Sequence, residues 1–284
     1  MNELSGLSNY PLARRGFVMT TLVSGFTLAT ERAEAQAIQT DSTGIEAGET
    51  KIPVPGGSLP AYYARPAKGT KFPVIIVDEE AFGVHEYIKD VCRRLAKAGY
   101  LAVATEYYAR IGDLSKMTDI KQIVADFISK EPDAQYMADA DATVAWASQN
   151  KGDTNKLGVT GFCRGGRMTW LFAAHHPKVK AAVAWYGPLG GTPSPIQPAT
   201  ATDYAGDLLC PLLGLYGGQD PGIPVDAVKA AEAKAKAAKK TVEIVIYPDA
   251  PHGFHADYRP SYRKDAADDG WKRMLAWFKK YGVA

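Results

Sequence analysis

The segment Gly161-Phe162-Cys163-Arg164-Gly165-Gly166 limits the possible folds of this chain more than any other stretch. The apolar residues 156–160 before it are predicted to form a buried strand, and residues 168–174 after it have the pattern of a helix. A strand that turns into a helix within three residues needs neighbours without side chains, and the glycines supply them. Cys163 is then expected at the tip, in a strained conformation above a helix N-terminus, which is the arrangement of a nucleophile elbow. The alternative interpretation is a tight turn that contains a buried cysteine.

Predicted strands and helices alternate along most of the chain from Glu49 onward. We expect a hairpin of residues 51–55 and 59–64, strands at 72–78, 101–105, 156–160, 179–185, 211–216 and 242–247, and helices at 86–98, 120–129, 134–148, 168–174, 225–239 and 266–280. This order predicts an α/β-hydrolase fold, with a mostly parallel central sheet and helices on both faces. The segment 187–207, rich in Pro, Gly and Thr, is expected to be a loop over the site or else a long connector.

The size and charge of the chain narrow the classes of function. Its 284 residues fit one large α/β domain, which we place at 51–284. There are 33 basic and 31 acidic residues, so nothing in the charge favours a nucleic-acid partner. Cys92, Cys163 and Cys210 are too few for a disulfide scaffold and are expected to be free thiols, with a Cys92–Cys210 bridge as the alternative. We expect no cofactor and no metal ion.

The N-terminal residues are typical of an export signal. The stretch from Leu12 to Phe17, which contains Arg14 and Arg15, resembles a twin-arginine motif, and a moderately apolar segment follows it to Thr30. That segment is shorter than the ~20 residues of a membrane helix. Residues 35–37 form a site of the small-x-small kind. We therefore predict a signal peptide at 1–37, a linker at 38–50, export by the twin-arginine machinery and a periplasmic or secreted enzyme. The alternative is an ordinary N-terminus with a chance arginine pair.

A catalytic thiol needs a base, and the base needs a carboxylate that orients it. Asp220 follows the strand predicted at 211–216, and His252 follows the next strand, so both come after Cys163 in the order that α/β-hydrolases use. The carboxyl ends of these strands meet at the edge of the sheet where ligands bind. We predict Cys163 as nucleophile, His252 as base and Asp220 as the orienting acid. Asp249 suits a turn better.

Acyl transfer also requires donors for the negatively charged oxygen of the intermediate. One is expected to be the backbone N–H of Arg164, directly after the nucleophile, and the other an N–H in the loop after the strand 72–78. Ala81 is the candidate in that loop.

Three stretches together resemble the dienelactone hydrolase family: Glu80-Ala-Phe-Gly-Val, residues 99–110 and the Cys163 elbow. The similarity extends from about residue 50 to the C-terminus. The resemblance implies the same triad. It also implies that Glu80 lies beside the thiol and helps to convert it to thiolate when an anionic substrate binds, and that Arg110 holds the substrate carboxylate. The alternatives are that Glu80 only braces its loop and that Arg110 forms a surface salt bridge.

The sequence departs from the family pattern at one position. Enol-lactone hydrolases of the family carry a second arginine four residues after the histidine, where this chain has Ala256; Arg259 and His255 are the candidates to replace it in substrate binding. We expect hydrolysis of a lactone or carboxylic ester, a small molecule that can be anionic, through an acyl-cysteine. The alternatives are a thioesterase or general carboxylesterase with the same triad, and a non-catalytic protein with a redox-responsive thiol.

Overall fold

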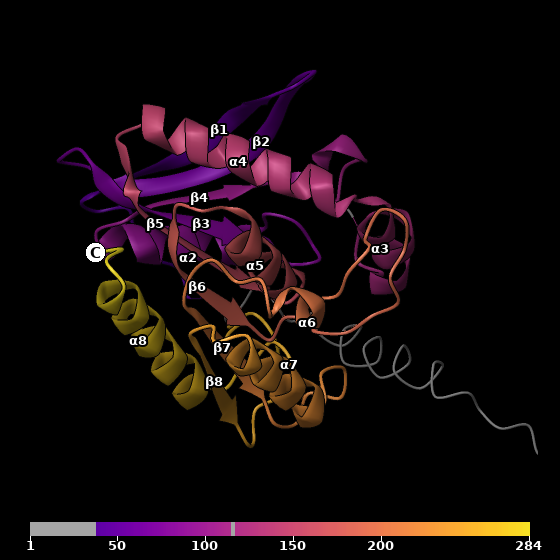
Figure 1. Ribbon diagram of the computed structural model, residues 1–284. Coiled ribbons are helices and arrows are strands. Elements are labelled where there is room, and N and C mark those ends of the chain that lie inside the picture. Colours follow the sequence, from indigo (N-terminus) through magenta and orange to yellow (C-terminus); the bar gives the residue numbers. More distant parts are fainter. Residues whose placement is uncertain (1–37, 115–116) are drawn as a thin grey trace, which may run out of the picture.

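The computed structural model describes residues 38–114 and 117–284, and the predicted signal peptide, 1–37, lies outside them. In this part of the chain eight strands form one sheet in the order β1-β2-β4-β3-β5-β6-β7-β8 (Figure 1). The strands are β1 (Ile45–Val54), β2 (Gly57–Pro66), β3 (Phe72–Asp78), β4 (Leu101–Thr105), β5 (Gly152–Phe162), β6 (Val179–Trp185), β7 (Leu212–Gly217) and β8 (Val242–Tyr247). The pairs β1–β2 and β2–β4 are antiparallel, and all further pairs are parallel.

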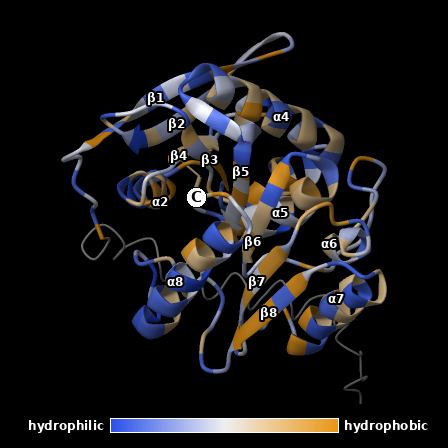
Figure 2. Ribbon diagram, turned by 60° about the vertical axis from the view of Figure 1, so that its left-hand side comes forward, coloured by the Kyte–Doolittle hydropathy of each residue, from blue (hydrophilic) through white to orange (hydrophobic). Residues whose placement is uncertain are grey.

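Helices cover both faces of this sheet, as a parallel sheet of buried strands requires. They are α2 (Glu86–Lys97), α3 (Ile120–Asp126), α4 (Asp133–Gln149), α5 (Arg164–His175), α6 (Ala201–Tyr204), α7 (Val225–Ala237) and α8 (Lys264–Lys280), with 3-10 turns η2 (Tyr107–Arg110) and η3 (Ile128–Lys130). Figure 2 shows α2 and α8 on one side of the sheet and α4, α5 and α7 on the other. The predicted α/β-hydrolase fold is confirmed.

The boundaries at the start of the domain differ from the prediction. The sequence predicts a linker at 38–50, yet β1 already begins at Ile45 and pairs with β2 in continuous register as far as the turn at Pro55 and Gly56. The segment 45–50 lacks a run of apolar residues, so its sequence does not predict a strand. The hairpin partner compensates, because Glu46 forms an ion pair with Arg65 across the two strands at 2.7 Å.

The helix predicted at 120–129 is also shorter than expected. α3 ends at Asp126, and after Phe127 the chain continues as η3. The segment 187–207 is mostly loop, as predicted, but it contains the one-turn helix α6, which Thr200 and Asp203 cap reciprocally.

The register of the parallel strands brings their carboxyl ends to one edge. Asp78 at the end of β3 pairs with Gly161, and the ends of β5 and β6 are likewise in register. The ends of β7 and β8 also pair with each other, so the loops after β3, β5, β7 and β8 leave the sheet at the same edge. Within the described residues no helix is long and apolar enough to span a membrane.

Candidate active site

Cys163 occupies the tip of a nucleophile elbow between β5 and α5. Its φ and ψ angles are 56° and −119°, a region that residues with a side chain rarely adopt, and α5 begins at the next residue. A Cβ atom added to Gly161 would lie 2.3 Å from the backbone oxygen of Gly165, and one added to Gly165 would lie 2.3 Å from that of Asp78. Larger residues would therefore force the strand and the helix apart. Cys163 is partly exposed and its thiol is free, as are those of Cys92 and Cys210.

His252 and Asp220 form the base and acid pair that the sequence predicts. His252 Nδ1 lies 2.6 Å from Asp220 Oδ2, and the other carboxylate oxygen accepts a hydrogen bond from the backbone N–H of Gly222 at 2.8 Å. A carboxylate only accepts hydrogen bonds, so Nδ1 carries the proton and Nε2 is left as the reactive nitrogen. Nε2 is buried and has no hydrogen-bond partner within the described residues.

Cys163 is a direct electrostatic neighbour of the His252 ring. Burial in the site opposes a charge on the imidazole, but Cys163 and Asp220 outweigh it and raise the pKa of His252 to about 10. An imidazole with a raised pKa is a strong base for the thiol proton, and the imidazolium that forms stabilises the thiolate, which is the nucleophilic form of cysteine. The geometry thus suits nucleophilic attack by Cys163.

Glu80 lies in a buried cluster that the sequence did not reveal. Its side chain is completely inaccessible to solvent. One carboxylate oxygen, Oε2, is hydrogen-bonded to three groups, which are Arg259 Nη2 at 3.0 Å, His85 Nε2 at 2.9 Å and the Tyr258 hydroxyl at 2.6 Å. Arg259 Nε also donates to the Tyr258 hydroxyl at 2.8 Å. These contacts bring together the loop after β3 and the segment after His252. They place the guanidinium of Arg259 at Glu80. Cys163 is among the groups that raise the pKa of Arg259.

Glu80 is ionised in this arrangement. Burial alone would favour the neutral acid, but Arg259 and His85 reverse the effect and lower the pKa of Glu80 to about 2. The second carboxylate oxygen, Oε1, is buried without a hydrogen-bond partner in the described part of the chain. An oxygen of a buried carboxylate without a partner is costly, so this cluster has capacity for one more donor.

The loop that carries the second predicted oxyanion donor is fixed from both ends. Ala81 is 3% exposed and lies in a tight turn. The turn is closed by a hydrogen bond from the N–H of Gly83 to the backbone carbonyl oxygen of Glu80. Glu106, the residue directly after β4, accepts a hydrogen bond from the N–H of Val84 at 2.8 Å. Arg164 is the first residue of α5, so its N–H has no carbonyl within the helix to bond. Both N–H groups therefore lie in segments that follow strand ends at one edge of the sheet, and their role as oxyanion donors stays a prediction.

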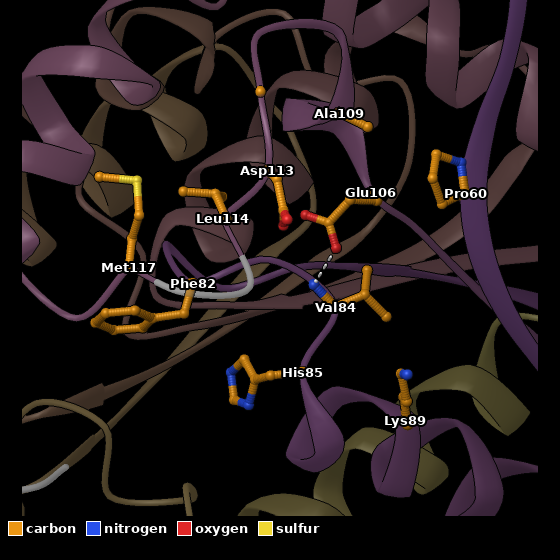
Figure 3. Close-up of a pocket in the computed structure, with 11 residues that line it drawn as sticks. Pro60, Phe82, Val84, His85, Lys89, Glu106, Ala109, Asp113, Leu114 and Met117 are labelled. Carbon is orange, nitrogen blue, oxygen red and sulfur yellow. Dashed lines mark hydrogen bonds between the residues drawn. The ribbon is translucent and has the colours of Figure 1, made fainter.

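A cavity of about 710 Å³ opens beside this loop (Figure 3). It is lined by Pro60, Phe82, Val84, His85, Lys89, Glu106, Ala109, Gly112, Asp113, Leu114 and Met117. Figure 3 shows the apolar side chains of Phe82, Leu114 and Met117 grouped on one side of it. His85 belongs to both the cavity and the Glu80 cluster, so a molecule in the cavity would contact a direct partner of Glu80.

His255 lies among the aromatic side chains of the core, and its predicted role in substrate binding stays a prediction. It is 3% exposed, its Nδ1 lies 2.6 Å from the Tyr87 hydroxyl, and its ring packs against Phe162, Trp185 and Trp271. Burial lowers its pKa to about 3, so it is a neutral core residue. The aromatic residues that surround it come from three distant segments, and spacing from His252 could not reveal them.

Arg110 forms a two-pronged ion pair with Asp139 of α4, with Nε–Oδ2 and Nη2–Oδ1 distances of 2.8 Å each. Within the described residues it makes no contact with Cys163, His252 or Glu80. Its role toward a substrate carboxylate stays a prediction. The contacts of His85 and Tyr258 with Glu80 were not predicted, because sequence spacing carries no signal for either.

The family model of the "Dienelactone hydrolase family" matches residues 59–282. The chain belongs to the dienelactone hydrolase family. Several relatives carry the name "Putative carboxymethylenebutenolidase". Among them, one from Methylorubrum extorquens is 57% identical over 96% of this chain and 94% of its own length, and one from Escherichia coli K12 is 51% identical over 93% of this chain and 97% of its own length. The expected family and enzyme class, a hydrolase of carboxylic esters, are confirmed.

A solved structure supports the same assignment. The crystal structure described as a "Putative Dienelactone Hydrolase" from Klebsiella pneumoniae is 52% identical, covers 84% of this chain and 99% of its own, and superposes with a TM-score of 0.82. The P91 phosphotriesterase, described as dienelactone hydrolase-like, is only 21% identical with a TM-score of 0.68, so it supports the fold alone. The chain is thus a dienelactone hydrolase family member over most of its length.

Proposed function

We propose that this enzyme hydrolyses a lactone or carboxylic ester through an acyl-cysteine intermediate on Cys163. The observation that carries the proposal is the His252–Asp220 pair at 2.6 Å with Cys163 as the electrostatic neighbour of the same imidazole. A nucleophile, a base and an orienting acid in this order are the minimum for covalent acyl transfer. The names of the relatives support a lactone as substrate.

The reaction then has two halves. The thiol proton passes to His252 Nε2, the thiolate of Cys163 attacks the carbonyl carbon, and the backbone N–H groups of Arg164 and Ala81 stabilise the negatively charged oxygen. The C–O bond breaks as the imidazolium protonates the leaving oxygen. In the second half, His252 takes a proton from water, the hydroxide attacks the thioester, and the carboxylic acid leaves as the thiol forms again.

Glu80 regulates the ionisation of the thiol in this proposal. Arg259, His85 and Tyr258 hold its charge in the resting enzyme, and a nearby negative charge disfavours thiolate. An anionic substrate that competes for Arg259 would release Glu80 and allow it to help ionise Cys163. The alternative, that Glu80 only braces the loop of Ala81, is separated from this one by an experiment described in the Discussion.

A burst experiment tests the covalent mechanism. With p-nitrophenyl acetate we expect a rapid release of nitrophenol equal to about one equivalent per enzyme, followed by a slower steady state as the acyl-cysteine hydrolyses. A redox-responsive thiol protein would release at most one equivalent and then stop. Acyl thioesters and neutral esters in the same assay separate a thioesterase or a general carboxylesterase from a lactonase, and steady turnover without a burst would argue against accumulation of an acyl-enzyme.

The proposed place of action is the periplasm or the medium, reached by twin-arginine export. This proposal rests on Arg14, Arg15 and the following apolar stretch, all outside the described residues. We expect that replacing both arginines with lysine leaves the precursor, uncleaved, in the cytoplasm. Cell fractionation with an antibody to the mature enzyme measures this. Unchanged recovery of a chain processed near Ala37 from the periplasm would contradict it.

A further inference from the structure

Arg164 places a charged guanidinium in a buried position without a carboxylate partner. The residue is 8% exposed, its Nε donates to no group within the described residues, and no ion pair of Arg164 occurs among them. Burial opposes its charge, but Tyr108, Glu131 and Asp133 nearby raise its pKa above the usual value. A buried cation is normally matched by an anion at ion-pair distance. The carboxylates of Glu131 and Asp133 act on Arg164 only from beyond ion-pair distance, so its guanidinium can bind a nearer anion.

The guanidinium belongs to a small cavity of about 180 Å³ between the N-terminus of α5 and the loop after β6. Its lining includes Arg164, Arg167, Thr192, Gln197 and Ala199. This volume suits a carboxylate and a few carbon atoms. Arg167 is already neutralised, because Asp133 binds it with two hydrogen bonds at 2.7 and 2.9 Å. Arg164 is therefore the arginine of this cavity with capacity for a new anion.

The loop that forms the cavity wall is fixed before any ligand binds. Gln197 Nε2 donates to the backbone oxygens of Ile128 and Glu131 at 2.6 and 2.9 Å. The N–H of Asp133 donates to the oxygen of Ile196 at 2.9 Å, and Arg167 donates to that of Ala199 at 3.0 Å. A wall held by four bonds loses little entropy when an anion binds, which is the property of a pre-formed site.

Arg164 connects this cavity with the elbow that carries the reacting sulfur. Arg164 follows Cys163 directly, and consecutive Cα atoms are about 3.8 Å apart. The loop 188–200 leaves the sheet from the end of β6, which is in register with the end of β5. One small molecule can therefore present its carbonyl carbon to Cys163 and a second group to Arg164.

We propose that Arg164 binds a carboxylate of the substrate and so selects anionic esters or lactones. The inference rests on the proposed ester hydrolysis and adds a specificity-determining residue to it. Arg110, which the family resemblance assigns to this task, has its guanidinium occupied by Asp139. Arg164 supplies this contact instead, through a guanidinium that can bind a carboxylate with two parallel hydrogen bonds.

The test compares two p-nitrophenyl esters of similar length, the mono-ester of glutaric acid and the ester of valeric acid. Wild-type enzyme is expected to have a lower KM for the anionic glutarate ester. Arg164→Gln is expected to reduce the ratio of kcat/KM for the anionic ester to that for the neutral ester by about 10- to 100-fold, mainly through KM, because hydrogen bonds to charged groups contribute about 1.5–3 kcal/mol. Arg164→Lys is expected to restore part of the ratio. The two kcat/KM values of each ratio come from the same variant, so a loss of activity that affects both esters equally does not change the ratio.

Two further variants keep the test decisive. Arg110→Gln is the matched control, and loss of the ratio in this variant instead of Arg164→Gln would overturn the proposal. Thr192→Glu changes an exposed side chain at the cavity and introduces a competing carboxylate, so it is expected to lower the same ratio even if Arg164→Gln fails to fold. An unchanged ratio in Thr192→Glu, or in folded Arg164→Gln, would also overturn it. Absence of hydrolysis of both esters by wild type would instead reject the proposed ester hydrolysis.

Discussion

Cys163→Ala is expected to lower kcat/KM for ester hydrolysis by at least about 10⁴-fold, which corresponds to roughly 5 kcal/mol of lost transition-state stabilisation. The reason is that no other nucleophile stands at the elbow, and the oxyanion donors alone give only weak catalysis. Cys210→Ala is the matched control: Cys210 is buried, and burial raises the pKa of its thiol to about 12, so its removal should leave the chemistry intact. Steady-state kinetics with p-nitrophenyl acetate measure both variants.

Stability measurements on the same position distinguish chemistry from folding. Alanine has the same difficulty as cysteine with a φ of 56°, so Cys163→Ala should unfold at nearly the same denaturant concentration as wild type. Cys163→Gly relieves the strain and should be about 1 kcal/mol more stable than Cys163→Ala. Both variants should be inactive. Turnover near the wild-type rate in either folded variant would contradict the assignment of the nucleophile.

Glu80→Gln is expected to lower the free energy of unfolding by about 3 kcal/mol at pH 7, because it leaves the buried Arg259 without its carboxylate. The effect has a defined pH dependence. The pKa of Glu80 is lowered to about 2 in the folded enzyme, so its contribution is complete above the ordinary carboxyl range near pH 4.5 and is lost as the pH falls through about 2. The difference in stability between wild type and Glu80→Gln should therefore shrink in acid.

The double variant Glu80→Gln/Arg259→Gln separates the two roles of Glu80. Removing both charges avoids an isolated buried cation, so stability should recover in large part. If Glu80 helps to ionise the thiol, turnover should stay at least about 10²-fold low in the double variant. If Glu80 only braces its loop, turnover should recover with stability.

The rate at which the Cys163 thiol is alkylated in the absence of substrate tests the role of Glu80 independently. On the proposed role, the negative charge of Glu80 disfavours thiolate in the empty site, so iodoacetamide should react faster with Glu80→Gln than with wild type at neutral pH. Curves of rate against pH that superimpose for the two proteins would leave Glu80 as a structural residue.

The elbow and the order of the triad could be predicted from the sequence because both are local. The glycines around Cys163 report a close approach of strand and helix, and Asp220 and His252 each follow an apolar strand. The parallel sheet then brings these loops together without further information. The fold itself follows from the same alternation of strands and helices, apart from the early start of β1.

The surroundings of Glu80 could not be predicted, because they depend on contacts between distant residues. Arg259 is 179 positions from Glu80 and reaches it only through the course of the segment after His252. The partner of Arg110 is likewise decided by Asp139 on α4, and no spacing within 99–110 reveals it. Side-chain partners of this kind are determined by tertiary packing, which leaves no periodic signal in the sequence.

The most direct test of the central claim is the mass of the enzyme during turnover. Wild type is mixed with p-nitrophenyl acetate, quenched with acid within milliseconds, digested and analysed by mass spectrometry. The account predicts an added acetyl group on the peptide that contains Cys163, with an occupancy that follows the burst and a bond that hydroxylamine cleaves. Turnover with the acetyl group on another residue, or with unmodified Cys163 throughout a burst of nitrophenol, would contradict an acyl-cysteine mechanism.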